Sequence, residues 1–102
     1  MLDAALLKNA LQVPMAFEDG EEFTDVTTDS RAIVPGCLFV ALKGEKFDGH
    51  RFVAQALKDG ARGAVVSEVP EGVPADRCIL VPDTLEAYQK IASRYRLGKK
   101  GR

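Results

Sequence analysis

The apolar run from Leu38 to Leu42 (LFVAL) constrains the fold of this chain more than any other feature of its sequence. Five consecutive apolar residues leave no polar face, so the segment suits a strand that is buried on both sides. Pro35-Gly36 before the run predicts a turn, and the glycine-containing, charged stretch 43–49 after it predicts a loop. A strand covered on both faces is typical of the sheets in α/β domains.

Shorter segments elsewhere in the chain complete the predicted pattern. The β-branched and aromatic residues typical of strands gather in three further segments, 23–27, 64–66 and 79–81. Apolar residues recur at helical spacing in three others, 2–11, 52–57 and 85–95. The order helix, strand, strand, helix, strand, strand, helix predicts an α/β fold, a small sheet of about four to five strands with helices packed on it.

Aspartates stand at the expected starts of the three helices. Asp3 suits the positive end of the first helix, and Asp48 and Asp83 occupy the N-cap positions of the second and third. Gly60 follows the second helix where a C′ glycine belongs, and Gly98 is expected to end the last one. The chain therefore carries its own start and stop signals for the predicted elements.

Composition predicts one soluble domain. Its 102 residues, 46% hydrophobic and 28% charged, can bury one modest core. A net charge of -1 creates no overall attraction for nucleic acid or acidic lipid, and the acidic stretch 18–25 and the basic tail 99–102 are interpreted as solvated surface. The chain has neither the roughly 20-residue apolar run of a membrane span nor a signal-peptide pattern. We expect a cytoplasmic protein without nucleic-acid or membrane partners.

The two cysteines do not indicate a metal site. Cys37 and Cys78 are far apart in the sequence, and His50 is the only imidazole. This spacing matches no zinc-binding pattern, so no metal is expected. Each cysteine opens an apolar run and is interpreted as a small buried residue. A disulfide between them remains possible at this stage.

Polar loops after two predicted strands are the candidate binding site. In open α/β sheets, ligands bind beyond the carboxyl ends of the strands, and the loops 28–31 and 43–50 take that position. The Ser30 hydroxyl can bond a nucleobase or sugar, and Phe47 can stack on a base. Three cations of these loops can pair with a phosphate: Arg31, Lys43 and Lys46. The amides of the segment 49–50, at a helix start, can also face an anion.

A structural interpretation of the same residues is equally open. Asp48 is expected to cap the helix, and Asp29 and Ser30 can do no more than order a turn. Phe47 can belong to the core, and His50 is expected to be a surface or capping residue, since no nucleophile stands beside it in the sequence. The chain contains no phosphate-loop motif, dinucleotide fingerprint or nucleophile elbow. We therefore predict a binding domain without catalytic residues of its own.

A long ordered run of motifs covers most of the chain. It comprises T-D-S-R at 28–31, P-G-C-L-F-V-A-L-K-G at 35–44, D-G-H at 48–50, G-A at 60–61 and D-T-L-E-A at 83–87. This run resembles the N-terminal domain of the Mur ligases, the ATP-dependent amide-forming ligases of peptidoglycan synthesis. The resemblance is weakest before Phe23 and after Tyr95.

The resemblance extends to two branches of that family. One branch adds D-alanyl-D-alanine to UDP-N-acetylmuramoyl-tripeptide, and the other adds the third amino acid to the dipeptide precursor. The segment 44–48, G-E-K-F-D, is similar to the loop of the first branch, whereas Ser30 is typical of the second. We favour the first branch.

The resemblance also implies that this domain and the other domains of the full-length ligase have different roles. Residues 1–97 are the domain that recognises the UDP-sugar, and 98–102 are a linker or truncated tail. The domain itself takes no cofactor; ATP and magnesium belong to the central domain of the full-length ligase. That domain and a C-terminal domain are absent from this chain, so the fragment alone is expected to be inactive. The implied UDP-binding residues are Thr28, Asp29, Ser30, Arg31, Lys43, Gly44, Glu45, Lys46, Phe47 and Asp48.

Two other classes of function remain as alternatives. One is a non-enzymatic interaction domain that keeps the fold and uses its surface for protein contacts. The other is a nucleotide-binding α/β module unrelated to cell-wall synthesis, which binds nucleotides without preference for the muramoyl-peptide part.

Overall fold

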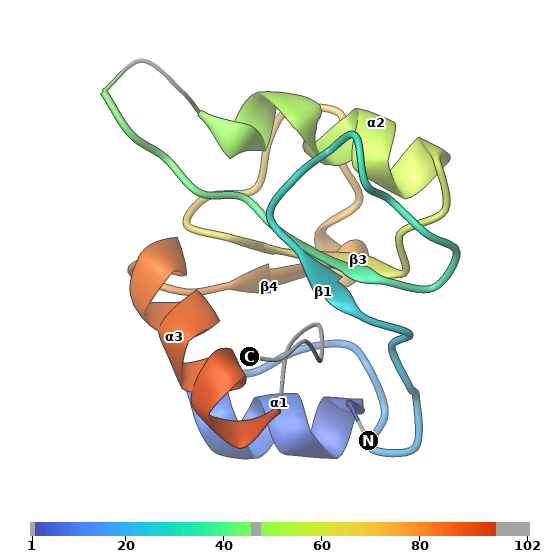
Figure 1. Ribbon diagram of the computed structural model, residues 1–102, viewed down its shortest axis with the longest axis vertical. Coiled ribbons are helices and arrows are strands. Elements are labelled where there is room, and N and C mark those ends of the chain that lie inside the picture. The colour runs from blue at the N-terminus through green and yellow to red at the C-terminus, as the bar shows by residue number, and fades with distance from the viewer. Residues whose placement is uncertain (1, 46–47, 96–102) are drawn as a thin grey trace.

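Four parallel strands form one central sheet in the computed structural model, which describes residues 2–45 and 48–95. The strands follow one another in chain order across the sheet (Figure 1). They are β1 (Val26–Thr27), β2 (Leu38–Val40), β3 (Gly63–Val66) and β4 (Cys78–Leu80). All three pairings are parallel, so the carboxyl ends of the four strands lie at the same edge. The α/β fold predicted from the sequence is confirmed.

Helices cover both faces of this sheet. The helices α1 (Ala4–Leu11) and α3 (Thr84–Arg94) pack against each other on one face, and α2 (Val53–Lys58) lies on the other (Figure 1). Two 3-10 turns, η1 (Gly49–Phe52) and η2 (Ala75–Arg77), precede α2 and β4. In the described part of the chain, no helix is long and apolar enough to cross a membrane.

The strand β2 is buried on both faces, as its continuous apolar sequence predicts. Leu38 and Val40 face the core beneath α1 and α3, whereas Phe39 faces the core beneath α2. All three side chains are 0% exposed. Side chains alternate between the faces of a strand, so one short segment contributes to both cores.

Aspartate caps start two of the helices where the sequence places them. An Asp3 carboxylate oxygen accepts the Leu6 N–H at 2.9 Å, and Asp83 accepts the Leu85 N–H at 3.0 Å. Gly60 follows the C-cap of α2 with a φ of 124°, a conformation in which a side chain would be strained. These cap predictions are confirmed.

Several element boundaries differ from the prediction because backbone groups find other partners. The strand expected over 23–27 shortens to Val26–Thr27, since the Phe23 N–H donates to the Leu2 carbonyl at 2.8 Å. The strand expected over 38–42 ends at Val40, and the Leu42 carbonyl instead accepts the Gly49 N–H. The last helix ends at Arg94, and Gly98 lies outside the described residues.

Both cysteines are buried and free. Cys37 is 0% exposed and Cys78 is 6% exposed, and both belong to the core beneath α2. Burial raises the pKa of both thiols, which keeps them in the neutral form. The interpretation of these residues as small buried side chains is confirmed.

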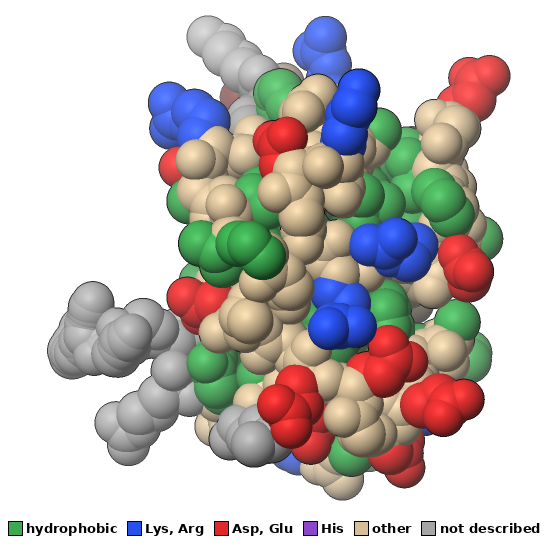
Figure 2. Space-filling model, turned by 90° about the vertical axis from the view of Figure 1, so that its right-hand side faces the viewer, with side chains coloured by type: hydrophobic (Ala, Val, Ile, Leu, Met, Phe, Trp, Pro, Cys, Tyr) green, Lys and Arg blue, Asp and Glu red, His purple; other side chains and the backbone are tan. Residues whose placement is uncertain are grey.

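The acidic stretch 18–25 lies largely on the surface, near the amino edge of the sheet. Asp19 pairs with Lys8 at 2.8 Å, and Glu21 lies 3.6 Å from a guanidinium nitrogen of Arg62. Figure 2, which faces this edge, shows several acidic side chains gathered on the lower part of this face, with most of the basic side chains in its middle and upper parts. Exposed pairs of this kind contribute little to stability, so the stretch is chiefly solvated surface, as predicted.

Replacing Phe39 with alanine tests the double-sided core. The Phe39→Ala variant removes a fully buried ring, and we expect the free energy of unfolding to fall by about 3–5 kcal/mol in urea titrations. Val34→Ala is the control, because Val34 is 45% exposed and its truncation should cost less than about 0.5 kcal/mol. Similar losses in the two variants would contradict this arrangement of the core.

Candidate functional site

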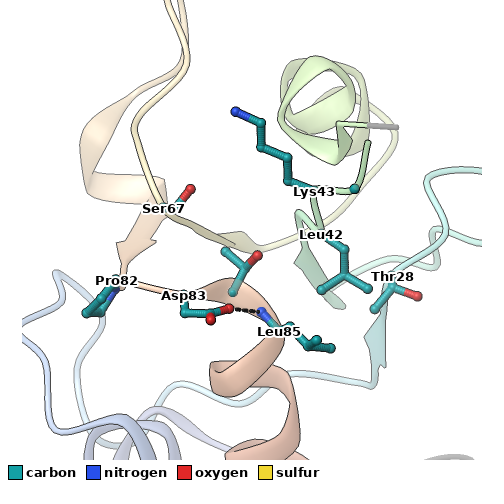
Figure 3. A pocket seen from close by; sticks show the side chains of 9 residues that line it. Thr28, Leu42, Lys43, Ser67, Pro82, Asp83 and Leu85 are labelled. Carbon is teal, nitrogen blue, oxygen red and sulfur yellow. Dashed lines mark hydrogen bonds between the residues drawn. The ribbon is translucent and has the colours of Figure 1, made fainter. Parts of the chain in front are cut away.

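A pocket of about 450 Å³ opens at the edge where the carboxyl ends of the four strands meet. Figure 3 shows that its walls come from segments that follow different strands, with the start of α3 on one side. Its lining residues are Thr28 after β1; Leu42, Lys43 and Gly44 after β2; Ser67 after β3; and Pro82, Asp83, Thr84 and Leu85 after β4. The position matches the rule that ligands of open α/β sheets bind at this edge.

A second hollow, of about 410 Å³, adjoins the pocket. It is lined by the segment 28–31 together with Phe52 from η1. Thr28 lines both cavities, so they are neighbours. The two loops predicted to form a binding site are therefore brought to one region, with Thr28, Lys43 and Gly44 around the pocket and 28–31 around the adjoining hollow.

Local hydrogen bonds order the turn at 28–31. The Asp29 N–H donates to the Thr27 hydroxyl oxygen at 3.0 Å, and the Asp29 carboxylate accepts the Arg31 N–H at 2.8 Å. The Arg31 guanidinium lies 3.2 Å from the same carboxylate, although the Arg31 side chain is 89% exposed. The backbone N–H and then the side chain of Arg31 lower the pKa of Asp29. Asp29 therefore orders this turn, and its role in ligand binding stays a prediction.

A close backbone contact closes the base of the loop that follows β2. The Gly49 N–H donates to the Leu42 carbonyl at 2.6 Å, and Lys43 bridges to Asp48 in antiparallel fashion. A Cβ atom at position 49 would lie 2.9 Å from the Leu42 carbonyl oxygen and 3.0 Å from the Ala41 Cα. Both neighbours are backbone, which cannot move aside, so only glycine fits here.

Asp48 caps the 3-10 turn η1. Its carboxylate accepts the His50 backbone N–H at 3.0 Å, and the same oxygen lies 2.7 Å from the His50 ring nitrogen Nδ1. The backbone N–H and then the ring of His50 lower the pKa of Asp48. The capping role predicted for Asp48 is thus confirmed for the 3-10 turn that leads into α2, whereas the N-cap of α2 itself is Phe52, which makes no side-chain cap bond.

Two possibilities raised for this turn do not hold. The amides of Gly49 and His50 are not free for a ligand anion, because they donate to the Leu42 carbonyl and to the protein's own Asp48 carboxylate. Of the surface or capping position expected for His50, the surface position is wrong, because its residue exposure is only 7%; its ring joins the cap through Asp48 instead. Its ring nitrogen Nε2 lies 2.9 Å from the backbone nitrogen of Ser67, at the end of β3. The cap folds the ring inward, a result that no local pattern indicates.

Four of the predicted site residues do not appear in the described lining of either cavity. Glu45 and Asp48 line neither cavity, and Lys46 and Phe47 lie outside the described residues. Sequence reasoning missed the lining residues after β3 and β4, namely Ser67, Pro82, Asp83, Thr84 and Leu85. The sequence does contain a signal for these residues. They directly follow predicted strands, and a parallel sheet brings all such positions to one edge.

The polar groups of the pocket suit an organic ligand better than a bare metal ion. Within residues 2–45 and 48–95, no three His, Cys, Asp or Glu side chains gather in a way that holds a metal ion. The pocket instead combines hydroxyls of Thr28 and Ser67, the ammonium of Lys43 and the apolar side chains of Leu42 and Leu85. A few polar groups on an apolar lining are typical of small-molecule sites.

Comparison with known proteins adds the family context. Residues 22–96 match the family model described as "Mur ligase family, catalytic domain". A UDP-N-acetylmuramoyl-tripeptide–D-alanyl-D-alanine ligase of Synechocystis sp. is 48% identical over 73 residues, which are 71% of this chain and 16% of the relative. A UDP-N-acetylmuramoyl-L-alanyl-D-glutamate–2,6-diaminopimelate ligase of Parasynechococcus marenigrum is 43% identical over 99 residues, 92% of this chain and 20% of the relative. The chain thus spans between 16% and 20% of the length of these relatives.

Solved structures agree with this comparison. A crystal structure of MurF from Acinetobacter baumannii superposes with a TM-score of 0.75 and 31% identity, covering 91% of this chain and 20% of the other. A structure of MurF ligase from Thermotoga maritima in complex with ADP gives a TM-score of 0.59 and 34% identity, covering 67% of this chain and 16% of the other.

The lowered pKa of Asp48 predicts a pH-dependent contribution to stability. A carboxyl whose pKa is depressed in the folded state stabilises that state above its unfolded pKa of about 3.9, and this stabilisation disappears as pH falls through the folded value. We expect Asp48→Asn to melt a few degrees below the wild type at pH 7, with the gap closing toward pH 2. Glu45→Gln, which removes an exposed carboxylate of the same loop, should melt like the wild type throughout. Thermal melts across this range would contradict the assignment if the Asp48→Asn gap did not change with pH.

Proposed function

This chain belongs to the Mur ligase family, and we propose that it is the N-terminal domain that recognises UDP-N-acetylmuramoyl-tripeptide in a ligase that adds D-alanyl-D-alanine. In this proposal, residues 1–97 hold the UDP end of the substrate. The segment 98–102, proposed as a linker, lies outside the described residues. The matching family model is described as a catalytic domain. We propose that this chain contributes to catalysis by holding the substrate.

The observation that carries the proposal is the pair of adjoining cavities at the carboxyl edge of the sheet. They have volumes of about 450 and 410 Å³ and share Thr28. Single ligand sites commonly have volumes of about 300–1,000 Å³. Two such cavities that meet at Thr28 suit an elongated ligand with a flat base, a sugar and a charged diphosphate. The family-like motifs at 28–31 and 43–44 supply part of both walls.

The chemistry of the lining supports distinct roles for its residues. Leu42 and Leu85 offer apolar contact to a base or ribose, and the Ser67 hydroxyl offers a hydrogen bond. Lys43 and Arg31, one on each cavity, are exposed cations that can meet a diphosphate. The Arg31 guanidinium has five N–H donors, so contact with Asp29 leaves some of them for a ligand.

The start of α3 contributes shape to the pocket more than free donors. The Asp83 carboxylate already accepts the Leu85 and Glu86 N–H groups, at 3.0 and 3.3 Å. Those amides are therefore satisfied without a ligand. We propose that positive charge for the diphosphate comes from Lys43 and Arg31.

The choice between the two branches of the family rests on similarity. The Synechocystis ligase, which acts on the tripeptide precursor by its name, is 48% identical, and the Parasynechococcus ligase of the diaminopimelate type is 43% identical over a longer stretch. The G-E-K-F-D segment at 44–48 supports the first branch, and Ser30 supports the second. We propose the D-alanyl-D-alanine branch, with the diaminopimelate-type branch as the second candidate.

ATP enters this proposal through the complete ligase. The Thermotoga MurF structure contains ADP, and the chain has no G-x-x-x-x-G-K-[ST] phosphate loop. We propose that ATP and magnesium act in the central domain of the full-length protein, and that this chain alone has no ligase activity.

Calorimetric titration of the chain tests the proposed function. The ligands are UDP-N-acetylmuramoyl-tripeptide, the dipeptide precursor, UMP and ATP. We expect saturable binding of the UDP-sugar ligands and none of ATP. Binding of UMP and ATP with equal affinity, and without gain from the muramoyl-peptide part, would instead support a general nucleotide-binding module. If no ligand binds, the same titration on the full-length ligase separates a site completed by other domains from an interaction domain.

Arg31→Ala tests the role of the hollow at 28–31. The Arg31 side chain is 89% exposed, so its loss should leave the melting temperature nearly unchanged. Loss of a charge-assisted contact to the diphosphate should weaken binding about tenfold. Arg51→Ala is the matched control, because Arg51 is also exposed but lines neither cavity. Equal affinities of the two variants, or a large drop in melting temperature for Arg31→Ala, would show that Arg31 does not bind the ligand.

A further inference from the structure

His50 has a role that the proposed function does not yet explain. Its residue exposure is 7%, and both of its ring nitrogens have partners. Nδ1 lies 2.7 Å from a carboxylate oxygen of Asp48, and Nε2 lies 2.9 Å from the backbone nitrogen of Ser67. The ring therefore connects the loop after β2 with the end of β3, 17 residues apart in the sequence.

These contacts define the protonation state of the ring. A backbone N–H can only donate, so Nε2 of His50 accepts the hydrogen bond from Ser67. A neutral imidazole that accepts at Nε2 carries its proton on Nδ1, and that proton points to the Asp48 carboxylate. The geometry selects the neutral tautomer with hydrogen on Nδ1.

The same contacts argue against a nucleophilic role for Ser67. Asp48, His50 and the Ser67 hydroxyl, 3.1 Å from Nε2, are connected in the order of a catalytic triad. However, Nε2 has a single lone pair in the ring plane, and the backbone N–H of Ser67 approaches it more closely, at 2.9 Å. A nitrogen that already accepts this bond is not free to take the hydroxyl proton.

The link from Asp48 through the His50 ring to Ser67 lies beside the pocket. Ser67 lines it from the end of β3, and Lys43 and Gly44 line it from the loop whose base contains Asp48. Gly49 bonds that base to Leu42, so the loop has one anchor two residues after β2 and another, through His50, at Ser67 directly after β3. The distance across this part of the pocket therefore depends on the His50 ring.

We propose that His50 is a positioning residue for the pocket: in its neutral form it holds the loop that carries Lys43 and Gly44 against the end of β3 at Ser67. The ligand assigned to the pocket rests on the proposed function, whereas the link itself is present without a ligand. Replacing the ring should change the pocket even though His50 does not line it.

Substitutions of His50 by two amide side chains test its two ring nitrogens separately. His50→Gln places a carbonyl oxygen at the reach of Nε2, where it can accept the Ser67 N–H. His50→Asn keeps a donor near Nδ1 for Asp48, but its shorter side chain does not reach Ser67. Ser67→Ala is the control, because it removes the hydroxyl and keeps the backbone N–H. The three variants therefore separate a link to the backbone from a role of the hydroxyl.

Hydrogen exchange of the Ser67 amide is measured first, in the free wild type and the variants. We expect exchange about tenfold faster in His50→Asn, with shifted amide resonances of Lys43 and Gly44, because one buried hydrogen bond is lost. His50→Gln and Ser67→Ala should stay within about twofold of the wild type. Unchanged Ser67 exchange in His50→Asn, or equally fast exchange in His50→Asn and His50→Gln, would overturn the proposal.

The affinity for UDP-N-acetylmuramoyl-tripeptide is measured second. We expect a loss of about tenfold in His50→Asn and recovery to within about twofold in His50→Gln. Equal affinities of wild type and His50→Asn, despite faster exchange, would overturn the positioning role. If the wild-type protein binds no UDP ligand while exchange changes as expected, the proposed function fails and the link between the loop and β3 is supported.

A nitrogen NMR spectrum of the wild-type ring keeps the proposal testable even if His50→Asn does not fold. A proton on Nδ1 and an unprotonated Nε2 at neutral pH are expected from the contacts with Asp48 and Ser67. A proton on Nε2, or a charged ring, would overturn the proposal, because Nε2 would then be unable to accept the Ser67 N–H.

Discussion

The burial of β2 on both faces is the constraint on which the rest of this structure depends. A strand that presents Leu38 and Val40 to one side and Phe39 to the other must be covered twice, by α1 and α3 on one face and by α2 on the other. Such a strand also needs hydrogen-bonding partners on both edges, and β1 and β3 provide them in parallel. Parallel pairing in turn places every carboxyl end at one edge. The pocket is thus a consequence of how this one strand is buried.

The D-G-H motif that follows β2 shows how three adjacent residues serve that edge. Asp48 caps η1 and accepts the His50 ring proton, Gly49 allows backbone to touch backbone at Leu42, and His50 reaches Ser67 directly after β3. None of the three lines the pocket. In the positioning role proposed above, their common effect is to hold the loop that does line it.

Membership of the Mur ligase family gives this edge its most specific interpretation. The chain spans only 16–20% of the relatives described above, so its function is proposed as one part of a larger reaction. Substrate recognition suits a unit with two adjoining cavities, exposed cations on both, and a sequence without a phosphate loop. In the proposed function, holding the distal end of a long substrate would also supply binding energy that positions the reacting end elsewhere in the full-length ligase.

Local sequence patterns determined the class of fold, the order of the elements, the capping aspartates and the two loops at the carboxyl edge of the sheet. These features depend on periodicity, turn propensity and the polarity of parallel sheets, all of which act over a few residues. Only the tertiary structure decided that Phe23 bonds to Leu2, that the His50 ring is buried against Ser67, and that positions 82–85 complete the pocket. Each of these depends on groups that are distant in sequence and become neighbours only when helices and strands pack. The amides of Gly49 and His50 show where prediction from local sequence ends. Their hydrogen-bond partners, the Leu42 carbonyl and the Asp48 carboxylate, depend on how the loop closes at its base, and no local pattern describes that closure.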